Sequence, residues 1–187
     1  MIGNDPRVEV RKTHKLFVGG AFPRSESGRT YEVVNTNGEF LANVAKASRK
    51  DARDAVIAAR TGFNSWSKAT AYNRGQVLYR IAEVMEGRKD QFASDIQDAE
   101  GTSKKKATAQ TDQAIDRVVW YAGWADKYAQ VLGNTNPVSG PFFNFSIPEP
   151  TGVVAAVAPQ DSSLLGLVSV IAPIVTSGNS VIVIAST

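Results

Sequence analysis

The sequence contains no cysteine and only one histidine among its 187 residues. The lack of cysteine excludes disulfides, thiolate metal sites and a cysteine nucleophile within this chain. The one histidine, His14, stands beside a polar N-terminal stretch, whereas catalysis and metal binding need several converging groups. We therefore expect His14 to lie on the surface, and we predict no metal site.

Long hydrophobic runs are also missing. Pro159, Gln160 and Asp161 interrupt one apolar stretch, and Pro173 and Gly178 interrupt the next. None reaches the roughly 20 residues that a membrane span requires, and no apolar core of a signal peptide follows Met1. We expect a soluble, cytoplasmic protein that does not bind a membrane.

Neither charge sign dominates, since 21 Lys and Arg face 18 Asp and Glu, for a net charge of +3. This small, dispersed excess does not indicate a nucleic-acid partner. The one dense basic run, Lys104–Lys106, is interpreted as the solvated start of a helix. Hydrophobic residues make up 43% of the chain, as in an ordinary globular protein.

The first 47 residues indicate a small β layer. Residues 1–13 are polar and read as a flexible arm, and 15–22 predicts a short hairpin around two glycines. Strands are expected at 30–35 and 40–47, joined by a tight turn at Asn37-Gly38.

Four helices are expected next, at 52–66, 71–88, 89–99 and about 105–132. Ser48 with Asp51 predicts a capping box, Thr70 a second N-cap, and Gly101 and Gly133 helix ends. Apolar residues at helical spacing predict which faces are buried. In the first helix they are Ala55, Ala58, Ala59 and Phe63, and in the second Val77, Leu78, Ile81, Val84 and Met85.

Segment 137–150 differs from its surroundings because it carries four prolines and alternates apolar with polar residues. Proline cannot donate to a strand ladder, so this segment is predicted at a sheet edge or outside the main sheet. Its three phenylalanines would leave an exposed edge unstable, and a partner chain is the expected cover.

The last 37 residues predict one βαβ unit, with strand 152–158, turn 159–162, helix 163–177 and strand 180–185. Both strands are nearly all apolar, as parallel strands covered on both faces are. One such unit is not a whole domain, so the chain reads as part of a larger α/β fold.

Several stretches resemble the N-terminal part of the NAD(P)-dependent aldehyde dehydrogenases. They are "LFVGGAF" (16–22), "DAVIAAR" (54–60), "YAGWADKY" (121–128), "GPFFNFSIPEPTGVV" (140–154) and "IAPIVTSGNSVIV" (171–183), in the family's order. The resemblance implies a small β layer and helices at 14–136, an oligomerisation-arm strand at 137–150, and the first βαβ of a Rossmann-like coenzyme domain at 151–187. It also implies that the nucleophilic cysteine and general-base glutamate of the family lie outside this chain.

The resemblance places two family sites on this sequence. The turn usually reads Pro-Trp-Asn-Phe-Pro, and its Asn stabilises an oxyanion, an interaction that can be worth about 3–4 kcal/mol. Here Pro159 is kept, but Asp161 stands at the Asn position, and an ionised Asp has no hydrogen to donate. At the second site, the family's ribose-binding Lys and Glu correspond to Ile184 and Thr187.

No catalytic residue is assigned in this chain. The positions equivalent to the family's cofactor-binding residues are Val157, Ala158, Pro159, Gln160, Asp161, Ile184, Ala185 and Thr187. The resemblance implies NAD or NADP as cofactor, with weak or lost binding because both polar ribose contacts are replaced.

Structural interpretations compete with these functional ones. Asp161 and the two serines after it could form a helix N-cap or keep a ligand contact. Glu100-Gly101 is interpreted as a helix end rather than a catalytic acid. Four aromatic residues at helical spacing are interpreted as packing or interface residues: Trp120, Tyr121, Trp124 and Tyr128.

Three functions remain open. The chain could be a noncatalytic member of the family that serves in homo- or hetero-oligomeric assembly through 137–150, and this is the reading we favour. It could instead be the leading piece of an oxidoreductase that converts an aldehyde to a carboxylic acid. Thirdly, it could be a module that binds a different ligand.

Overall fold

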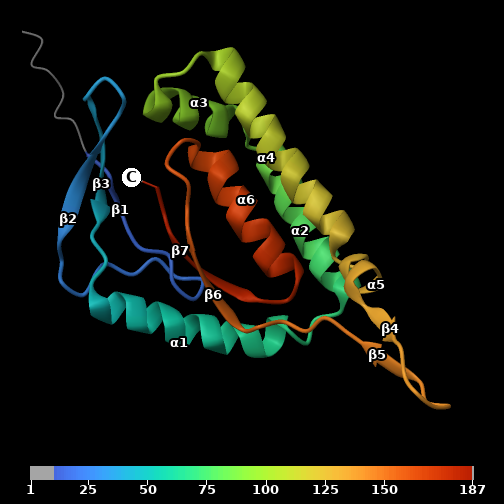
Figure 1. Cartoon of the computed structure of the whole chain (residues 1–187). Coiled ribbons are helices and arrows are strands. Elements are labelled where there is room, and N and C mark those ends of the chain that lie inside the picture. Colours follow the sequence, from blue (N-terminus) through green and yellow to red (C-terminus); the bar gives the residue numbers. More distant parts are fainter. Residues whose placement is uncertain (1–10, 187) are drawn as a thin grey trace, which may run out of the picture.

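The computed structural model describes residues 11–186, and its elements follow the predicted α/β order (Figure 1). The N-terminal layer has β1 (Thr13–His14), β2 (Thr30–Val34) and β3 (Phe40–Ala45), in the spatial order β1-β3-β2. Of the predicted arm 1–13, residues 1–10 lie outside the described residues. Thr13 belongs to β1, which pairs in parallel with β3. His14 is exposed, as expected.

The two glycine turns predicted in this layer both form. At Asn37-Gly38 the prediction is confirmed, because β2 and β3 pair on either side and Gly38 has a φ of +80°. The hairpin expected at 15–22 forms as a short one: Val18 and Ala21 bridge across the turn, and the Leu16 N–H bonds the Pro23 carbonyl at 3.1 Å. Gly19 and Gly20 reverse the chain at once, and among the described residues no strand pairs with the flanks to extend the bridge into a ladder.

The helix starts follow the predicted capping residues. Helix α1 (Arg49–Trp66) begins with a capping box in which Ser48 and Asp51 bond each other's backbone N–H groups. Thr70 caps α2 (Ala71–Glu86), and α3 (Lys89–Glu100) ends at Gly101 in the left-handed conformation. Ser103 caps the next helix, so that Lys104–Lys106 forms its exposed first turn, as interpreted.

The long helix expected over 105–132 is divided into two, contrary to the prediction. Helix α4 (Lys104–Trp124) stops, and α5 (Tyr128–Leu132) follows after a tight turn. In this turn the N–H groups of Ala125 and Lys127 bond carbonyls three residues back rather than four. The turn lies where Ala125 is buried against Gly75 of α2, a close contact that the sequence pattern alone did not reveal.

The core lies where α2, α4 and α6 (Ser163–Thr176) meet, beside α3. Of the predicted stripe on α2, Leu78 and Met85 are buried, together with Ala82. Val77, Ile81 and Val84 are exposed instead, so the prediction was wrong for these three. The stripe was too wide, because the core neighbours of α2 cover only one side of the helix. On α1, the predicted alanines and Phe63 are half-buried.

Segment 137–150 lies outside the parallel sheet, as expected, but its boundaries change. Strand β5 (Asn144–Ser146) pairs antiparallel with β4 (Asn134–Asn136), which begins before the predicted segment. The sequence analysis did not predict β4, because this strand is short and polar and shows no alternation of apolar and polar residues. Figure 1 shows this hairpin projecting from the body of the molecule.

The βαβ unit is confirmed. Strands β6 (Val153–Val157) and β7 (Ser180–Ile184) are parallel and joined through α6. Both α1 and α6 contact this pair, which lies between the two helices in Figure 1. Trp66 at the end of α1 donates its indole N–H to the carbonyl of Val175, at 2.9 Å, and so ties α1 to α6. In residues 11–186 no helix has the length and apolar character needed to cross a bilayer.

Candidate functional site

The two sites implied by the sequence lie side by side at the carboxyl ends of β6 and β7. The register pairs Val157 with Ile184, the last residue of each strand, and the Ala158 N–H bonds the Ile184 carbonyl at 2.9 Å. Ligands of open α/β sheets bind at this edge. The structure therefore brings together the two stretches that sequence reasoning treated separately.

This edge is apolar and open. The side chains of Val157 and Ile184 are 65% and 66% exposed, while Ala158 is buried. Ala185 is exposed just beyond β7. Thr187, the last of the predicted positions, lies outside the described residues. Of the two residues that the resemblance assigns to ribose binding, the described one is Ile184, whose side chain can make no hydrogen bond.

The turn after β6 is held by its proline. A Cβ added to Gly166 of α6 would lie 3.3 Å from three atoms of the Pro159 ring, so proline and helix are in close contact. Gln160 and Asp161 are exposed at the tip of the turn. The proline fixes the shape of the turn, and the two residues that follow it face solvent.

Neither Asp161 nor the serines cap α6 in the way the structural interpretation expected. Ser162 occupies the N-cap position, but its side chain makes no capping bond, and its buried hydroxyl has no partner. Glu100 of α3 supplies the cap. Its Oε1 accepts from the backbone N–H of Ser163 at 2.9 Å and from the Ser163 hydroxyl at 2.7 Å.

Glu100 is thus a site residue whose contact the sequence reasoning missed, although it does end α3 as interpreted. Burial acts to raise the pKa of its carboxyl, but the bonds from Ser163 and from the Gln110 amide, 2.8 Å away, outweigh burial and lower it. A carboxylate is favourable at a helix N-terminus and unfavourable at a C-terminus. Glu100 is the last residue of α3, where its charge is unfavourable. This position was the sequence signal that its carboxylate binds a group outside α3.

Two carboxylates stand near this edge, Asp161 in the turn and Glu100 at the start of α6. The family resemblance assigns Asp161 to the position of an Asn, and an ionised aspartate accepts hydrogen bonds but has none to donate. The positive end of the α6 dipole, another possible anion site, already faces the carboxylate of Glu100. Within residues 11–186, no three His, Cys, Asp or Glu side chains gather as metal ligands would.

The predicted aromatic residues differ in their surroundings. The Tyr128 hydroxyl accepts a bond from buried Arg74 at 3.4 Å, which agrees with a packing role. Trp120 is 63% exposed, and its ring centroid lies 6.1 Å from that of Trp124. Trp120 and Tyr121 line a depression beside α4 rather than a core.

Comparison with known proteins identifies the family. The sequence model described as "Aldehyde dehydrogenase family" matches residues 22–187, most of the chain. The chain belongs to the aldehyde dehydrogenase family. The resemblance inferred from the sequence is confirmed, and so is the α/β fold that it implied.

Curated members of the aldehyde dehydrogenase family are similar along nearly the whole chain. Aldehyde dehydrogenase family 2 member B4 of Arabidopsis thaliana, a mitochondrial protein, is 33% identical over 182 residues, which are 95% of this chain and 33% of that protein. The putative aldehyde dehydrogenase DhaS of Bacillus subtilis is 34% identical over 161 residues, 83% of this chain and 32% of that one.

Solved aldehyde dehydrogenase structures have the same fold. An aldehyde dehydrogenase from Bacillus cereus aligns with a TM-score of 0.86 and 27% identity, covering 92% of this chain and 35% of that one. A betaine aldehyde dehydrogenase from Staphylococcus aureus, in complex with NAD+, aligns with a TM-score of 0.84 and 27% identity over 91% of this chain and 34% of that one. The chain thus spans about a third of the length of these relatives.

Proposed function

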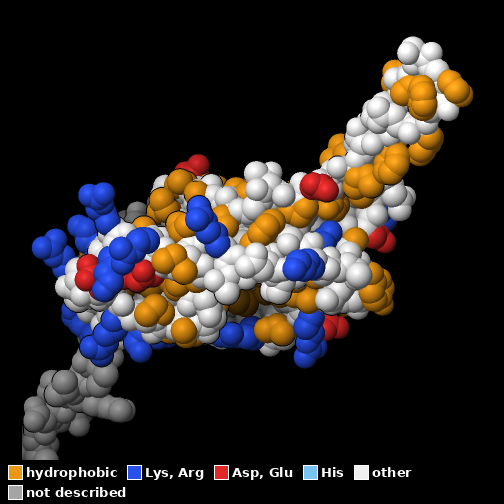
Figure 2. Space-filling model, turned by 90° about the horizontal axis from the view of Figure 1, so that it is seen from below, with side chains coloured by type: hydrophobic (Ala, Val, Ile, Leu, Met, Phe, Trp, Pro, Cys, Tyr) orange, Lys and Arg blue, Asp and Glu red, His pale blue; other side chains and the backbone are white. Residues whose placement is uncertain are grey.

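We propose that this chain is a noncatalytic member of the aldehyde dehydrogenase family that serves in subunit assembly. The observation that carries the proposal is the β4–β5 hairpin. It projects from the body in Figures 1 and 2, and apolar side chains cover much of its visible surface in Figure 2. Such a surface favours pairing with another chain.

The hairpin is ordered by its own polar contacts while its aromatic rings face solvent. The Asn136 amide donates to the Ser146 hydroxyl at 2.9 Å and to the Asn144 side chain at 3.2 Å. Phe143 is 76% exposed, and its ring lies tilted against that of Phe145 with centroids 5.4 Å apart. An exposed aromatic surface of this kind favours contact with a partner that covers it.

The residues at the carboxyl ends of β6 and β7 support the proposal that the chain is noncatalytic. Asp161 presents a carboxylate where the family resemblance implies an amide donor, and Ile184 stands where it implies a lysine. An ionised carboxylate opposes the charge that aldehyde oxidation would develop at this position. We infer that NAD or NADP binds weakly or not at all, and that the chain acts in the cytoplasm as a homo- or hetero-oligomer.

The assembly role is tested by light scattering after size-exclusion chromatography, for the chain alone and mixed with a full-length member of the family. We expect a dimer or larger species, or a complex with the homologue. The double variant Phe143→Ser, Phe145→Ser should release monomers. Tyr72→Ser, which changes an aromatic residue of similar exposure on α2, is the control. A wild-type chain that stays monomeric in both experiments contradicts the proposal.

The loss of coenzyme binding is tested by calorimetry with NAD and with NADP. We expect no saturable heat for either, and no formation of reduced coenzyme with a panel of aldehydes. Binding in the micromolar range would overturn the inference. The variant Asp161→Asn with Ile184→Lys, which restores the family's residues, should bind more tightly than the wild type.

A second function is favoured by the intact β6–α6–β7 unit and by the third of the relatives' length that the chain spans. It is that of the leading piece of an NAD(P)-dependent oxidoreductase that converts an aldehyde to a carboxylic acid. Sequencing the coding region beyond Thr187 distinguishes the two, because this alternative requires an in-frame continuation that carries a cysteine and a glutamate.

A further inference from the structure

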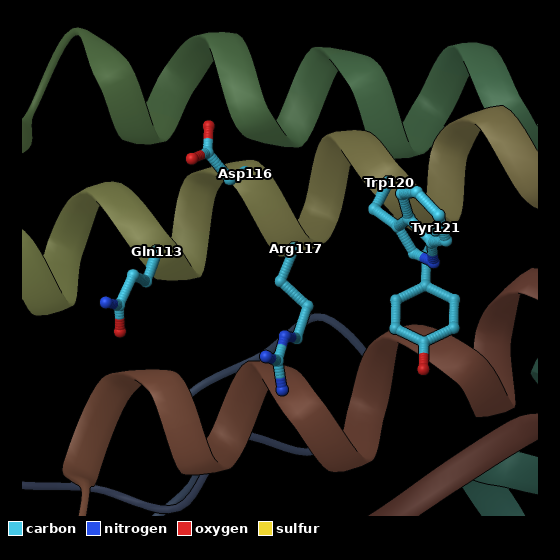
Figure 3. A pocket seen from close by; sticks show the side chains of 5 residues that line it. All are labelled: Gln113, Asp116, Arg117, Trp120 and Tyr121. Carbon is cyan, nitrogen blue, oxygen red and sulfur yellow. The ribbon is translucent and has the colours of Figure 1, made fainter.

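A depression of about 510 Å³ lies along α4, on a part of the surface that the proposed assembly role does not use. It is lined by Gln113, Asp116, Arg117, Trp120 and Tyr121. Gln113, Arg117 and Tyr121 are spaced four residues apart, and Figure 3 shows all three side chains pointing from α4 toward α6. The volume is within the range of small-molecule sites.

Arg117 is the cation of this depression, and it is held in place. One of its terminal nitrogens, Nη1, donates to the Ser169 hydroxyl oxygen of α6 at 2.8 Å. The Ser169 hydroxyl in turn donates to the carbonyl of Leu165, so its lone pairs face the guanidinium. The serine orients Arg117 but brings no negative charge to it.

The guanidinium of Arg117 can still bind an anion. Among the residues that the structure describes, no carboxylate lies within ion-pair distance of Arg117. Asp116, the one carboxylate of the lining, points away from α6 in Figure 3. A guanidinium has five N–H groups and matches the two oxygens of a carboxylate in a fork. Arg117 is thus oriented for an anion that none of residues 11–186 supplies.

The rest of the lining adds apolar contact and hydrogen bonds. Trp120 offers an exposed indole, and Tyr121 is half-buried with its hydroxyl toward α6. Aromatic walls beside a single cation suit a ligand that has an apolar body and one negative charge. A phosphate dianion usually needs more than one cation, and this lining has one.

We propose that the depression along α4 binds small monoanionic carboxylates with an apolar body, recognised by Arg117 and packed on Trp120 and Tyr121. This inference does not depend on the assembly role, because no residue of the β4–β5 hairpin takes part.

Benzoate is a suitable probe, titrated into the full chain and followed by calorimetry and by amide NMR shifts. We expect saturable binding on the order of 1 mM, with shifts centred on α4 and α6. Benzamide, which has the same shape without the charge, should bind about tenfold more weakly, since a charge-assisted bond is lost. Inorganic phosphate should bind more weakly than benzoate.

Variants distinguish specific recognition of benzoate by Arg117 from a general effect of positive charge on the surface. Arg117→Gln should weaken benzoate binding about tenfold, and Arg117→Lys should lie between the two because a single ammonium cannot form the fork. Arg80→Gln, which removes an exposed arginine paired with Glu83 on α2, is the matched control and should bind as the wild type does.

The proposal is overturned if benzoate does not saturate, if benzamide binds equally well, or if the Arg117 and Arg80 variants behave alike. Tighter binding of phosphate would overturn the assignment to carboxylates. The Phe143→Ser, Phe145→Ser variant should bind benzoate normally. Benzoate binding is expected whether or not the chain oligomerises, so each of the two proposals can be contradicted without the other.

Discussion

At the scale of single residues, short-range hydrogen bonds explain the best-predicted features. Ser48 and Asp51 are three residues apart and cap α1 together, as their spacing indicated. Tertiary contacts add to this local motif. The Asp51 carboxylate also accepts from the Ser25 hydroxyl at 2.7 Å and from the Glu26 N–H at 3.1 Å, which attaches the loop before β2 to the helix start.

This cluster predicts an acid-sensitive helix start. Bonds from the Ser48 backbone and the Ser25 hydroxyl lower the pKa of Asp51 from 3.8 to about 2. Because the unfolded carboxyl takes up its proton first, the stabilisation is complete above pH 3.8 and disappears as the pH falls toward 2.

The variant Asp51→Asn should therefore have a lower melting temperature at pH 6, and the difference from wild type should shrink by pH 2.5. Asp54→Asn, one turn further along α1, is the control and should show no such convergence. Thermal unfolding followed by circular dichroism measures both. A constant difference across the pH range would contradict the assigned role.

At the scale of elements, α6 depends on another helix for its N-terminus. Its own N-cap serine makes no capping bond, and the Glu100 carboxylate of α3 takes this place while Gln110 of α4 holds the second carboxylate oxygen. The turn after β6 is thus positioned by α3 and α4. Glu100 of α3 precedes Ser163 by 63 residues, and Gln110 of α4 precedes it by 53.

The variant Glu100→Gln should lower the free energy of unfolding by about 1 kcal/mol, because the charge at the N-terminus of α6 is removed. Asp98→Asn, an exposed position on the same helix, should change it by less than about 0.5 kcal/mol. Urea denaturation at neutral pH compares them. Equal effects of the two variants would exclude Glu100 as the cap.

At the scale of the whole molecule, Arg74 connects three distant segments. It is buried, and its guanidinium donates to the carbonyls of Ala69 and Thr176 and to the Tyr128 hydroxyl. Its Nε is 3.0 Å from the Thr176 oxygen, at the C-terminal end of α6, where a positive charge is favoured by the helix dipole. The start of α2, the end of α6 and α5 are therefore fixed to one another.

Replacing Arg74 by Ala should destabilise the chain by about 3 kcal/mol, since buried acceptors lose their donors. Arg80→Ala removes an exposed arginine from the same helix and should cost less than about 1 kcal/mol, as expected for a surface ion pair. Chemical denaturation gives both values. A cost for Arg74→Ala as small as that of the control would mean that the three segments are held by other contacts.

Much of the fold could be predicted because its signals are local. The capping residues, the Gly38 and Gly101 turns and the apolar strands β6 and β7 each carry their signal within a few residues. The errors lie where packing overrides local pattern. Val77 and Ile81 continue an apolar stripe but face solvent, and the helix after Lys104 stops early where Ala125 meets Gly75.

The residues of the candidate site also fall into those that could be predicted from the sequence and those that could not. Pro159, Asp161 and Ile184 could be placed after the two strands of one βαβ unit from sequence and family resemblance, and the structure adds that the register pairs the ends of these strands. Glu100 could not be found in this way, because nothing in a local sequence window says which distant helix its carboxylate will reach. The same holds for Arg117, whose position beside Ser169 exists only once α4 packs against α6.

The sequence by itself determined the family, the order of most elements and the identity of the residues at the ends of β6 and β7, since these follow from residue identities and short spacings. The tertiary structure alone decided that Glu100 caps α6, and that Ser169 holds Arg117 at a depression where none of residues 11–186 brings a carboxylate within ion-pair distance. These features depend on contacts between residues tens of positions apart. Such contacts arise when the helices pack, and no local pattern encodes them.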